Sequence, residues 1–125
     1  MTMAGYNAIT WFEIGTDNPA QAATFYGQVF GWSVSGEDSQ YQIITPGAGE
    51  GLPAGGLFDT QGAMPGYAIF TVLVQDVAGT CAQVEKAGGK VQRAPQVTPD
   101  GLTFAYLTDP AGNQFGVFTP PAGQP

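Results

Sequence analysis

This 125-residue chain contains no histidine, which limits the chemistry that its side chains can perform. Histidine is the usual general base near neutral pH and the commonest transition-metal ligand, so both roles lack their ordinary side chain. The single cysteine, Cys81, falls within a predicted helix. With no histidine to activate it, we interpret it as a small buried apolar residue rather than a nucleophile. One cysteine also excludes an intrachain disulfide, which is compatible with a cytoplasmic location.

The carboxylates are the remaining candidates for acid–base chemistry. Glu13 lies in a predicted strand, and alternation places it with Ile9 and Trp11 on the side that faces a helix. There it would be a hydrogen-bonded structural group or an interface residue, because a general base would have to reach the opposite side. Asp17 and Asp76 each precede a predicted helix and are better explained as helix caps. The sequence therefore assigns no catalytic residue.

Composition and charge narrow the class of partner. Ten acidic residues against three basic ones give a net charge of −7, which argues against a nucleic-acid partner. No apolar run approaches the ~18 residues of a membrane span, so no membrane is expected either. With 43% hydrophobic residues the chain can bury a core, and we expect one domain over residues 1–125.

Two predicted helices must position these side chains. The first begins near Pro19, after Asp17 or Asn18 as its cap, and ends at Gly31. Its apolar residues recur at the spacing of one helical face, which predicts that the face is buried. They are Ala22, Phe25, Tyr26, Val29 and Phe30. The second helix is predicted from about Val77 to Ala87, before Gly88 and Gly89.

The predicted elements form two copies of one pattern: strand, helix, strand, strand, strand. Strands are predicted at 7–15, 32–35, 41–45 and 54–58 in the first copy, and at 67–75, 90–93, 102–108 and 114–119 in the second. Residues 46–51 are predicted to form a mobile loop, and 94–101 a proline-bearing loop. We therefore predict an α+β fold of two βαβββ modules, 7–60 and 67–119, each with its helix on one side of its sheet.

The sheet faces turned away from the helices have the composition of a small-molecule pocket, apolar and aromatic with a few hydroxyls. By alternation these faces carry Thr10, Phe12, Ile14, Ile69, Thr71, Phe104 and Tyr106. The alternative is that these residues simply pack on one another as core. The sequence leaves both interpretations open.

At this point the chain resembles the vicinal oxygen chelate superfamily, which includes glyoxalase I, the bleomycin-resistance proteins and the extradiol dioxygenases. The resemblance covers about residues 7 to 119 and is carried by four segments. They are Trp11 to Ile14 followed by Asp17, the helix end from Phe25 to Trp32, the pair Gly88-Gly89, and Asp109 to Asn113. It implies two βαβββ modules whose sheets curve around a shared cavity.

The resemblance also indicates where metal-dependent members hold a divalent ion with His, Glu or Gln. Counting from the matching motifs, those positions fall on Thr10, Ile69, Gly116 and Gly55 or Gly56. Isoleucine and glycine have no donor side chain, and a threonine hydroxyl is a weak ligand. We therefore expect the family fold with no metal and no other cofactor.

These observations favour a metal-independent binder of an aromatic or hydrophobic small molecule, of the bleomycin-resistance kind. Phe12, Phe104 and Tyr106 would supply stacking area, Thr10 and Thr71 would supply hydrogen bonds, and the acidic surface would suit a cationic ligand. One alternative is a lyase, isomerase or dioxygenase-like enzyme of the same superfamily, and a second is a structural or regulatory dimer without ligand. A homodimer is expected in any case, because two small modules leave long sheet edges to cover.

Overall fold

The computed structural model describes residues 5–47 and 53–121, so most of the predicted loop 46–51 lies outside the described residues. The described residues form eight strands and two helices in the predicted order, and the α+β class is confirmed. In chain order these are β1 (Ile9–Thr16), α1 (Pro19–Phe30), β2 (Ser33–Ser35), β3 (Tyr41–Thr45), β4 (Ala54–Asp59), β5 (Tyr67–Leu73), α2 (Val77–Lys86), β6 (Lys90–Val97), β7 (Thr103–Thr108) and β8 (Gln114–Thr119).

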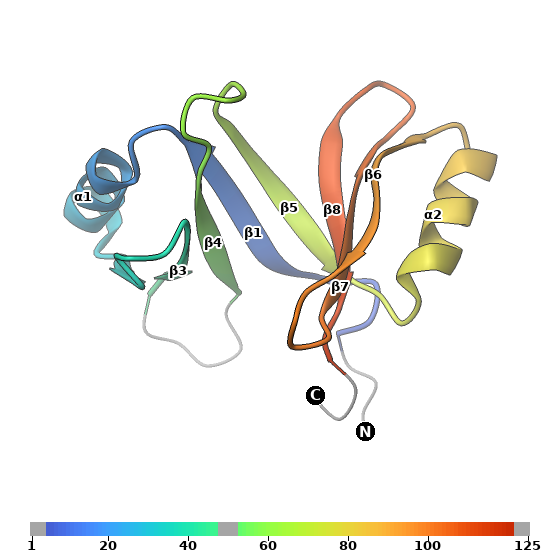
Figure 1. Cartoon of the computed structure of the whole chain (residues 1–125), viewed down its shortest axis with the longest axis horizontal. Coiled ribbons are helices and arrows are strands. Elements are labelled where there is room, and N and C mark those ends of the chain that lie inside the picture. Colours follow the sequence, from blue (N-terminus) through green and yellow to red (C-terminus); the bar gives the residue numbers. More distant parts are fainter. Residues whose placement is uncertain (1–4, 48–52, 122–125) are drawn as a thin grey trace. The chain divides into compact units, whose positions relative to one another are not determined.

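The chain divides into two compact units with the same topology (Figure 1). The first unit is residues 10–69, and the second is residues 1–9 with 70–125. The first unit has strand order β2-β3-β4-β1, in which β1 and β4 are parallel and the other neighbours antiparallel. In the second unit the order β6-β7-β8-β5 repeats this arrangement, with β5 and β8 parallel. Each unit is thus one βαβββ motif, as predicted.

Helix α1 begins and ends where its sequence predicts, although its cap is Asn18 and the explanation of Asp17 as a cap is wrong. The Asn18 side chain caps it by accepting a hydrogen bond of 3.1 Å from the backbone N–H of Gln21, and Pro19 takes the first helical position. At the other end Gly31 adopts the left-handed conformation, with φ of 76°, and its N–H donates to the Gly27 carbonyl.

The predicted burial of the α1 apolar face is wrong. None of the residues of α1, all within the described range, is buried, and Phe25, Val29 and Phe30 are 54%, 54% and 60% exposed. The Trp32 ring contacts both the helix and the sheet. It stacks on Tyr26 with centroids 5.2 Å apart, while Phe12 of β1 lies 5.6 Å from it. Trp32 therefore links α1 to β1, while much of the apolar stripe of the helix stays exposed.

Helix α2 packs more fully. Asp76 caps it by accepting a hydrogen bond of 3.0 Å from the Gly79 N–H. Val77 and Cys81 of the helix join a buried core whose sheet members include Ala105, Leu107 and Val117. Figure 1 shows α2 beside the strands that carry this core. The face of β7 that points toward α2 is therefore the face of Ala105 and Leu107.

Strand β6 is longer than predicted and takes in much of the proline-bearing loop. It runs from Lys90 to Val97, through Pro95, and its pairing with β7 shifts register between Val91 and Arg93 and between Arg93 and Gln96. A proline cannot donate to a strand ladder, so it is tolerated on an edge strand or at an irregularity. β6 is the outermost strand of its unit's sheet, which satisfies that condition.

Candidate functional site

A buried carboxylate in the first unit gathers three aromatic side chains. Glu13, in the middle of β1, is only 5% exposed. The Tyr41 hydroxyl of β3 donates to its Oε1 at 2.9 Å, and the Tyr67 hydroxyl of β5 donates to its Oε2 at 2.5 Å. The Trp11 indole Nε1–H in turn donates to the Tyr41 hydroxyl at 3.0 Å. We call Trp11, Glu13, Tyr41 and Tyr67 the Glu13 cluster.

Two glycines make room for the tyrosine rings. Gly56 of β4 lies beside Glu13 in the parallel register, and a Cβ there would overlap the Tyr41 phenol. A Cβ on Gly15 of β1 would likewise overlap the Tyr67 ring. Both rings therefore lie close over the sheet backbone, an approach that only glycine permits. Glycine in a strand often marks such a close approach.

The chemistry of the Glu13 cluster follows from its proton donors. Each phenol has one hydrogen, and both hydrogens point to the carboxylate, which acts as acceptor on both of its oxygens. Hydrogen bonds to an ionised group are shorter and stronger than neutral ones, so the two rings are held firmly. Trp11, Tyr41 and Tyr67 themselves are only partly buried, whereas Glu13 lies beneath them. The arrangement presents aromatic surface fixed by a buried anion.

The sequence prediction placed Glu13 on the wrong side of β1. Phe12 packs against Trp32, which stacks on Tyr26 of α1, so Phe12 lies on the helix side and Glu13 on the opposite one. A Cβ on Gly55 would overlap the Phe12 ring, which agrees with this assignment.

The predicted first-module residues Thr10, Phe12 and Ile14 therefore share the helix side of β1, and the prediction of an open face there is wrong. Ile14 pairs in register with the buried Leu57, as a core residue does. The Thr10 hydroxyl is buried and finds no hydrogen-bond partner among the residues that the structure describes.

In the second unit Phe104 and Tyr106 lie on the face turned away from α2, as alternation predicts, while the binding role of that face stays a prediction. Ala105 and Leu107 of β7 belong to the α2 core, so Phe104 and Tyr106 lie on the other face. Their rings make an edge contact, with centroids 5.7 Å apart and planes at 69°. Tyr106 pairs with Gly116, which pairs in turn with Thr71, and Thr71 is 8% exposed. The structure thus brings Thr71, Phe104 and Tyr106 onto one surface.

Ile69, the remaining predicted site residue, is placed within the first unit, because the division between the units falls after it. It is 9% exposed and counts among the core residues, so it offers little surface of its own.

The donor set does not fit the metal site of the family. Because the observed cap is Asn18 and not Asp17, the position seven residues before it is Trp11, and the matching position before Asp76 is Ile69. The other positions are Gly56, beside Glu13, and Gly116, beside Thr71. None of these side chains can bind a divalent ion. Within the described ranges, no three or more His, Cys, Asp or Glu residues gather as a metal site would require.

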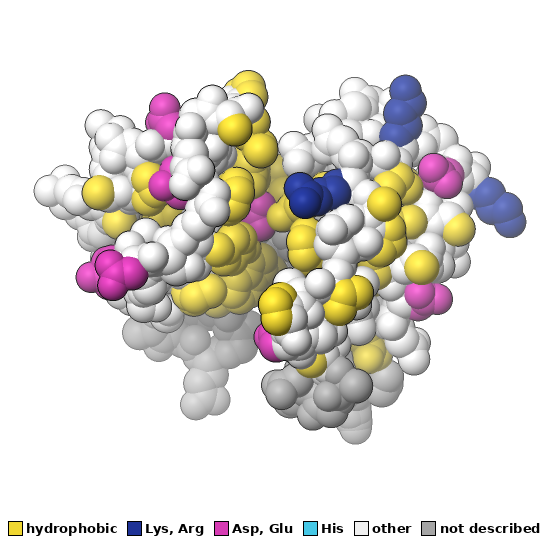
Figure 2. Space-filling model, viewed as in Figure 1, with side chains coloured by type: hydrophobic (Ala, Val, Ile, Leu, Met, Phe, Trp, Pro, Cys, Tyr) yellow, Lys and Arg dark blue, Asp and Glu magenta, His cyan; other side chains and the backbone are white. Residues whose placement is uncertain are grey.

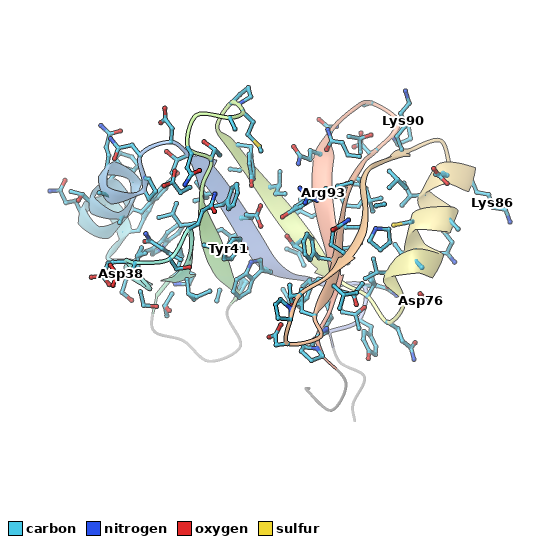
Figure 3. The ribbon with its side chains drawn as sticks, in the orientation of Figure 1. Asp38, Tyr41, Asp76, Lys86, Lys90 and Arg93 are labelled. Atoms are coloured by element: carbon cyan, nitrogen blue, oxygen red, sulfur yellow. The ribbon has the colours of Figure 1, made fainter. Side chains whose placement is uncertain are left out.

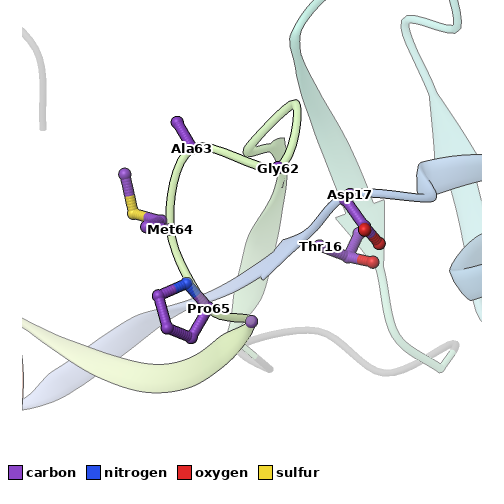
Figure 4. A pocket seen from close by; sticks show the side chains of 7 residues that line it. Thr16, Asp17, Gly62, Ala63, Met64 and Pro65 are labelled. Atoms are coloured by element: carbon purple, nitrogen blue, oxygen red, sulfur yellow. The ribbon is translucent and has the colours of Figure 1, made fainter.

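Two surface hollows lie at the α1 end of the first unit. Figure 4 shows the first, of about 480 Å³, lined by Thr16 and Asp17 after β1 and by residues 62–66 before β5. The second, of about 650 Å³, lies between α1 and the β2–β3 turn, where Glu37, Asp38 and Asp59 line it. Both hollows are open and bordered by carboxylates, so they add acidic surface rather than a second set of reactive groups.

Charge is divided unequally between the two units. Residues 10–69 contain six of the ten acidic residues and no lysine or arginine. The basic residues Lys86, Lys90 and Arg93 all lie on α2 and β6 of the second unit (Figures 2 and 3). Nearly all of the net charge of −7 therefore falls on the unit that contains the Glu13 cluster. A field of this sign favours cationic over anionic ligands.

The remaining titratable groups have structural explanations. Burial raises the pKa of the Cys81 thiol, and the nearby Glu85 charge raises it further, as expected of a thiol that is 7% exposed. The predicted buried state of Cys81 is confirmed. The pKa of Asp109 is lowered, first by the hydrogen bond from the Asn113 side chain and then by backbone N–H groups of the same turn. Asp109 thus closes the β7–β8 turn.

A comparison with protein families decides what the chain is related to. Residues 8–117 match the family described as Glyoxalase/Bleomycin resistance protein/Dioxygenase superfamily. The chain belongs to this superfamily. The resemblance carried by the sequence motifs is therefore confirmed, and so is the α+β fold of two βαβββ modules.

Individual relatives cover several activities. "Putative glyoxylase CFP32" of Mycobacterium bovis and of Mycobacterium tuberculosis is 31% identical over 116 residues, which cover 90% of this chain and 44% of the relative. "Anthracycline biosynthesis protein DnrV" of Streptomyces peucetius is 30% identical over an alignment of length 140, which covers 94% of this chain and 49% of the relative. The chain thus spans about half the length of these curated relatives.

Solved structures share the fold at lower sequence identity. A methylmalonyl-CoA epimerase from Streptomyces coelicolor superposes with a TM-score of 0.66 at 16% identity, covering 94% of this chain and 96% of the other. An Mn(II)-bound glyoxalase from Novosphingobium aromaticivorans gives 0.64 at 24% identity, covering 91% and 39%. At these identities the likeness concerns the fold. In the part of the chain that the structure describes, no helix is long and apolar enough to cross a membrane.

Proposed function

We propose that this chain is a metal-independent protein that binds an aromatic or hydrophobic small molecule. The observation that carries the proposal is the Glu13 cluster, in which partly exposed aromatic rings are held on the sheet face opposite α1. In the second unit Phe104 and Tyr106, beside Thr71, offer a similar surface on the face opposite α2. Pockets for organic ligands combine such aromatic area with a few fixed polar groups. A cytoplasmic location remains part of the proposal.

The family and one relative support an aromatic ligand. The superfamily description includes bleomycin-resistance proteins, and DnrV is named for anthracycline biosynthesis. Anthracyclines are planar polycyclic compounds, which aromatic side chains bind by stacking. The donor-poor residues Trp11, Ile69, Gly56 and Gly116 at the family's metal positions favour binding without a metal.

The test is a panel of planar aromatic compounds titrated against the protein, followed by tryptophan fluorescence. We expect Phe104→Ala and Tyr106→Ala to lower affinity at least ~10-fold, while losing less than the ~3–5 kcal/mol of a buried core aromatic in unfolding free energy. Val97→Ala on the edge strand β6, at a residue that is 68% exposed, is the control and should change neither. Should no compound bind the parent protein, while both variants unfold at low denaturant, these aromatics are core and the proposal fails.

A second candidate is an enzyme of the same superfamily: a lyase, an isomerase or a dioxygenase-like protein. The observation in its favour is that Glu13 lies on the sheet face away from α1, where a carboxylate can approach a ligand. The structural relatives named above include an epimerase and a glyoxalase. Recovery of a bound compound distinguishes the two functions: a binder returns it unchanged in mass and stereochemistry, whereas an enzyme returns a product. A structural dimer without ligand would bind nothing from the panel.

We also propose a homodimer in which α1 of one copy packs against α1 of a second copy. Phe25, Val29 and Phe30 are all more than half exposed, and no charged residue occurs between Pro19 and Phe30. In a protein with a net charge of −7, an uncharged apolar face is where two like-charged copies can approach most easily. The curated relatives have about twice the length of this chain, which would accommodate a second such domain.

Light scattering at micromolar concentration tests the dimer. We expect the mass of two chains for the parent protein and of one chain for Phe30→Glu, with a circular dichroism spectrum that shows the variant still folded, since Phe30 is largely exposed. Val97→Glu on the edge strand β6, at a residue that is 68% exposed, is the control and should stay dimeric. A monomeric parent protein would rule the interface out.

A further inference from the structure

The geometry of the Glu13 cluster joins three aromatic side chains from separate segments through one residue. Tyr41 lies 28 residues after Glu13 and Tyr67 lies 54 residues after it, yet both hydroxyls end on the same carboxylate. Trp11 is tied to the same network through the Tyr41 hydroxyl. The hydrogen bonds fix the polar ends of the rings, and close packing over the backbone at Gly56 and Gly15 restricts the planes of Tyr41 and Tyr67.

Stability alone does not account for a carboxylate in this place. Taking an ionised carboxylate out of water costs several kcal/mol, and its hydrogen bonds only compensate for that cost. Replacing such groups with well-packed apolar residues is often neutral or stabilising. What apolar contacts do not supply is a directional bond that ties a ring's polar end to one point. A phenol that donates to a fixed oxygen has a defined orientation.

The exposed fractions distinguish Glu13, which anchors the rings, from the rings themselves, which a ligand could contact. Glu13 is 5% exposed, while Trp11, Tyr41 and Tyr67 are each partly exposed. A ligand on this face would touch the rings and not the carboxylate. Affinity for a planar molecule depends on rings that are already in place, because each side chain that must be ordered on binding costs roughly 0.5–1.5 kcal/mol.

We infer that Glu13 is a positioning residue that holds the rings of Trp11, Tyr41 and Tyr67 as a preformed surface for a planar aromatic cation. The inference rests on the proposed small-molecule function and names the ligand class and the residue that sets the site. The cationic preference follows from the six carboxylates and the absence of basic residues in the sequence between residues 10 and 69. Stacking on the ring faces adds to it, because aromatic faces attract cations.

Two probes with the same three-ring skeleton test this inference. The cation is 9-aminoacridine and the anion is anthracene-9-carboxylate, and each is titrated against the full chain by its own fluorescence. The variants are Glu13→Gln, which keeps the shape and removes the charge, and Tyr67→Phe, which removes one hydroxyl. Tyr26→Phe, in the ring that stacks on Trp32 on the α1 side, is the matched control. In a Trp32→Phe background the remaining tryptophan, Trp11, reports ring mobility by fluorescence anisotropy.

We expect the parent protein to bind the cation more tightly than the anion. Glu13→Gln should weaken both probes by ~10-fold or more, and Tyr67→Phe by a smaller factor, because the rings lose their anchor. The cation-to-anion preference should change little, since five other carboxylates of residues 10–69 remain. Trp11 anisotropy should fall in Glu13→Gln and stay unchanged in Tyr26→Phe.

Other outcomes would overturn either the positioning role of Glu13 alone or the proposed function as well. If Glu13→Gln loses stability but binds both probes as the parent does, Glu13 only supports the fold. If it loses affinity for the cation alone, Glu13 acts as a charge on the ligand and not as a positioning residue. In both cases the small-molecule function stands. If the parent protein binds neither probe nor any compound of the aromatic panel, the proposed function fails and this inference fails with it. Tyr67→Phe decides between these outcomes should Glu13→Gln not fold.

Discussion

The contact between Gly56 and the Tyr41 ring makes the sharpest prediction about stability. In Gly56→Ala the new methyl group would overlap the Tyr41 phenol, so the ring must move. Moving it breaks the 2.9 Å hydrogen bond to Glu13 and disturbs the bond that Trp11 donates to the same hydroxyl. A change of one methyl group on β4 is therefore expected to act on a network anchored in β1.

The expected loss of unfolding free energy has two parts. Forcing an extra methyl group into a packed site costs roughly 1–3 kcal/mol. Losing a hydrogen bond to a charged group costs roughly 1.5–3 kcal/mol. The two costs are not independent, because a movement of the ring that relieves the overpacking also breaks the hydrogen bond. We therefore expect a total loss of about 2–5 kcal/mol, less than the sum of the two maxima. That loss is a large part of the ~5–15 kcal/mol that holds a typical domain folded.

Denaturant titration followed by circular dichroism gives the free energies. Gly27→Ala is the matched control: a methyl group there would meet only the Trp32 carbonyl oxygen at 3.4 Å, and alanine favours the helix interior by up to ~1 kcal/mol, so this variant should be slightly more stable. In a Tyr41→Ala background the cost of Gly56→Ala should almost disappear, because the ring that it displaces is gone. An equal cost with and without the Tyr41 ring would refute the reasoning, as would no cost at all.

Three further predictions concern other groups. Protein purified without a tag should contain far less than one zinc, nickel, iron or manganese per chain, and near-stoichiometric metal retained against a weak chelator would contradict the donor analysis. Because burial raises the pKa of Cys81, the thiol should react with a disulfide reagent much more slowly in the folded protein than in urea, and equal rates would show that it is exposed. The hydrogen bond from Asn113 lowers the pKa of Asp109 in the folded protein. The ionised Asp109 therefore stabilises the fold fully above its pKa in the unfolded chain, ~3.9, and this stabilisation is lost as the pH falls through its pKa in the folded protein. The stability difference between Asp109→Asn and the parent should therefore shrink on acidification, and a constant difference would contradict it.

The elements that were predicted well are those specified by local chemistry. Asn18 and Pro19 start α1, Gly31 ends it, and Asp76 starts α2, each through contacts within a few residues. The strands at Tyr41–Thr45 and Gln114–Thr119 match their predicted bounds because turn residues flank them. Burial of the α1 face was not predictable in the same way. Periodicity shows which residues are apolar, whereas what covers them depends on Trp32, which follows the helix.

The first-module site was missed by a shift of one residue. The predicted alternation places Thr10 on the open face, and the count from Asp17 likewise puts the family's metal position on Thr10. Counting from Asn18 puts that position on Trp11, on the face of Glu13. A strand has a period of two, so a one-residue shift moves every side chain to the opposite face. The sequence contained the signal that decides the count, since Pro19 is favoured at the first helical position and the residue before it is then the cap. In the second module Asp76 gave no such choice, and that face was predicted correctly.

The partners of Glu13 lie 28 and 54 residues away in the sequence, so no local pattern identifies them. Their presence can still be inferred from the residue types around Glu13. A carboxylate in the middle of an apolar strand must find donors, since burial without them costs too much. The donors must lie on neighbouring strands and need room, which only a residue without a Cβ gives them. Gly56 and Gly15 are such residues, and each lies under a tyrosine. Glycines within strands that flank an isolated acidic residue therefore point to large polar rings folded over the backbone, and here they point to the Glu13 cluster.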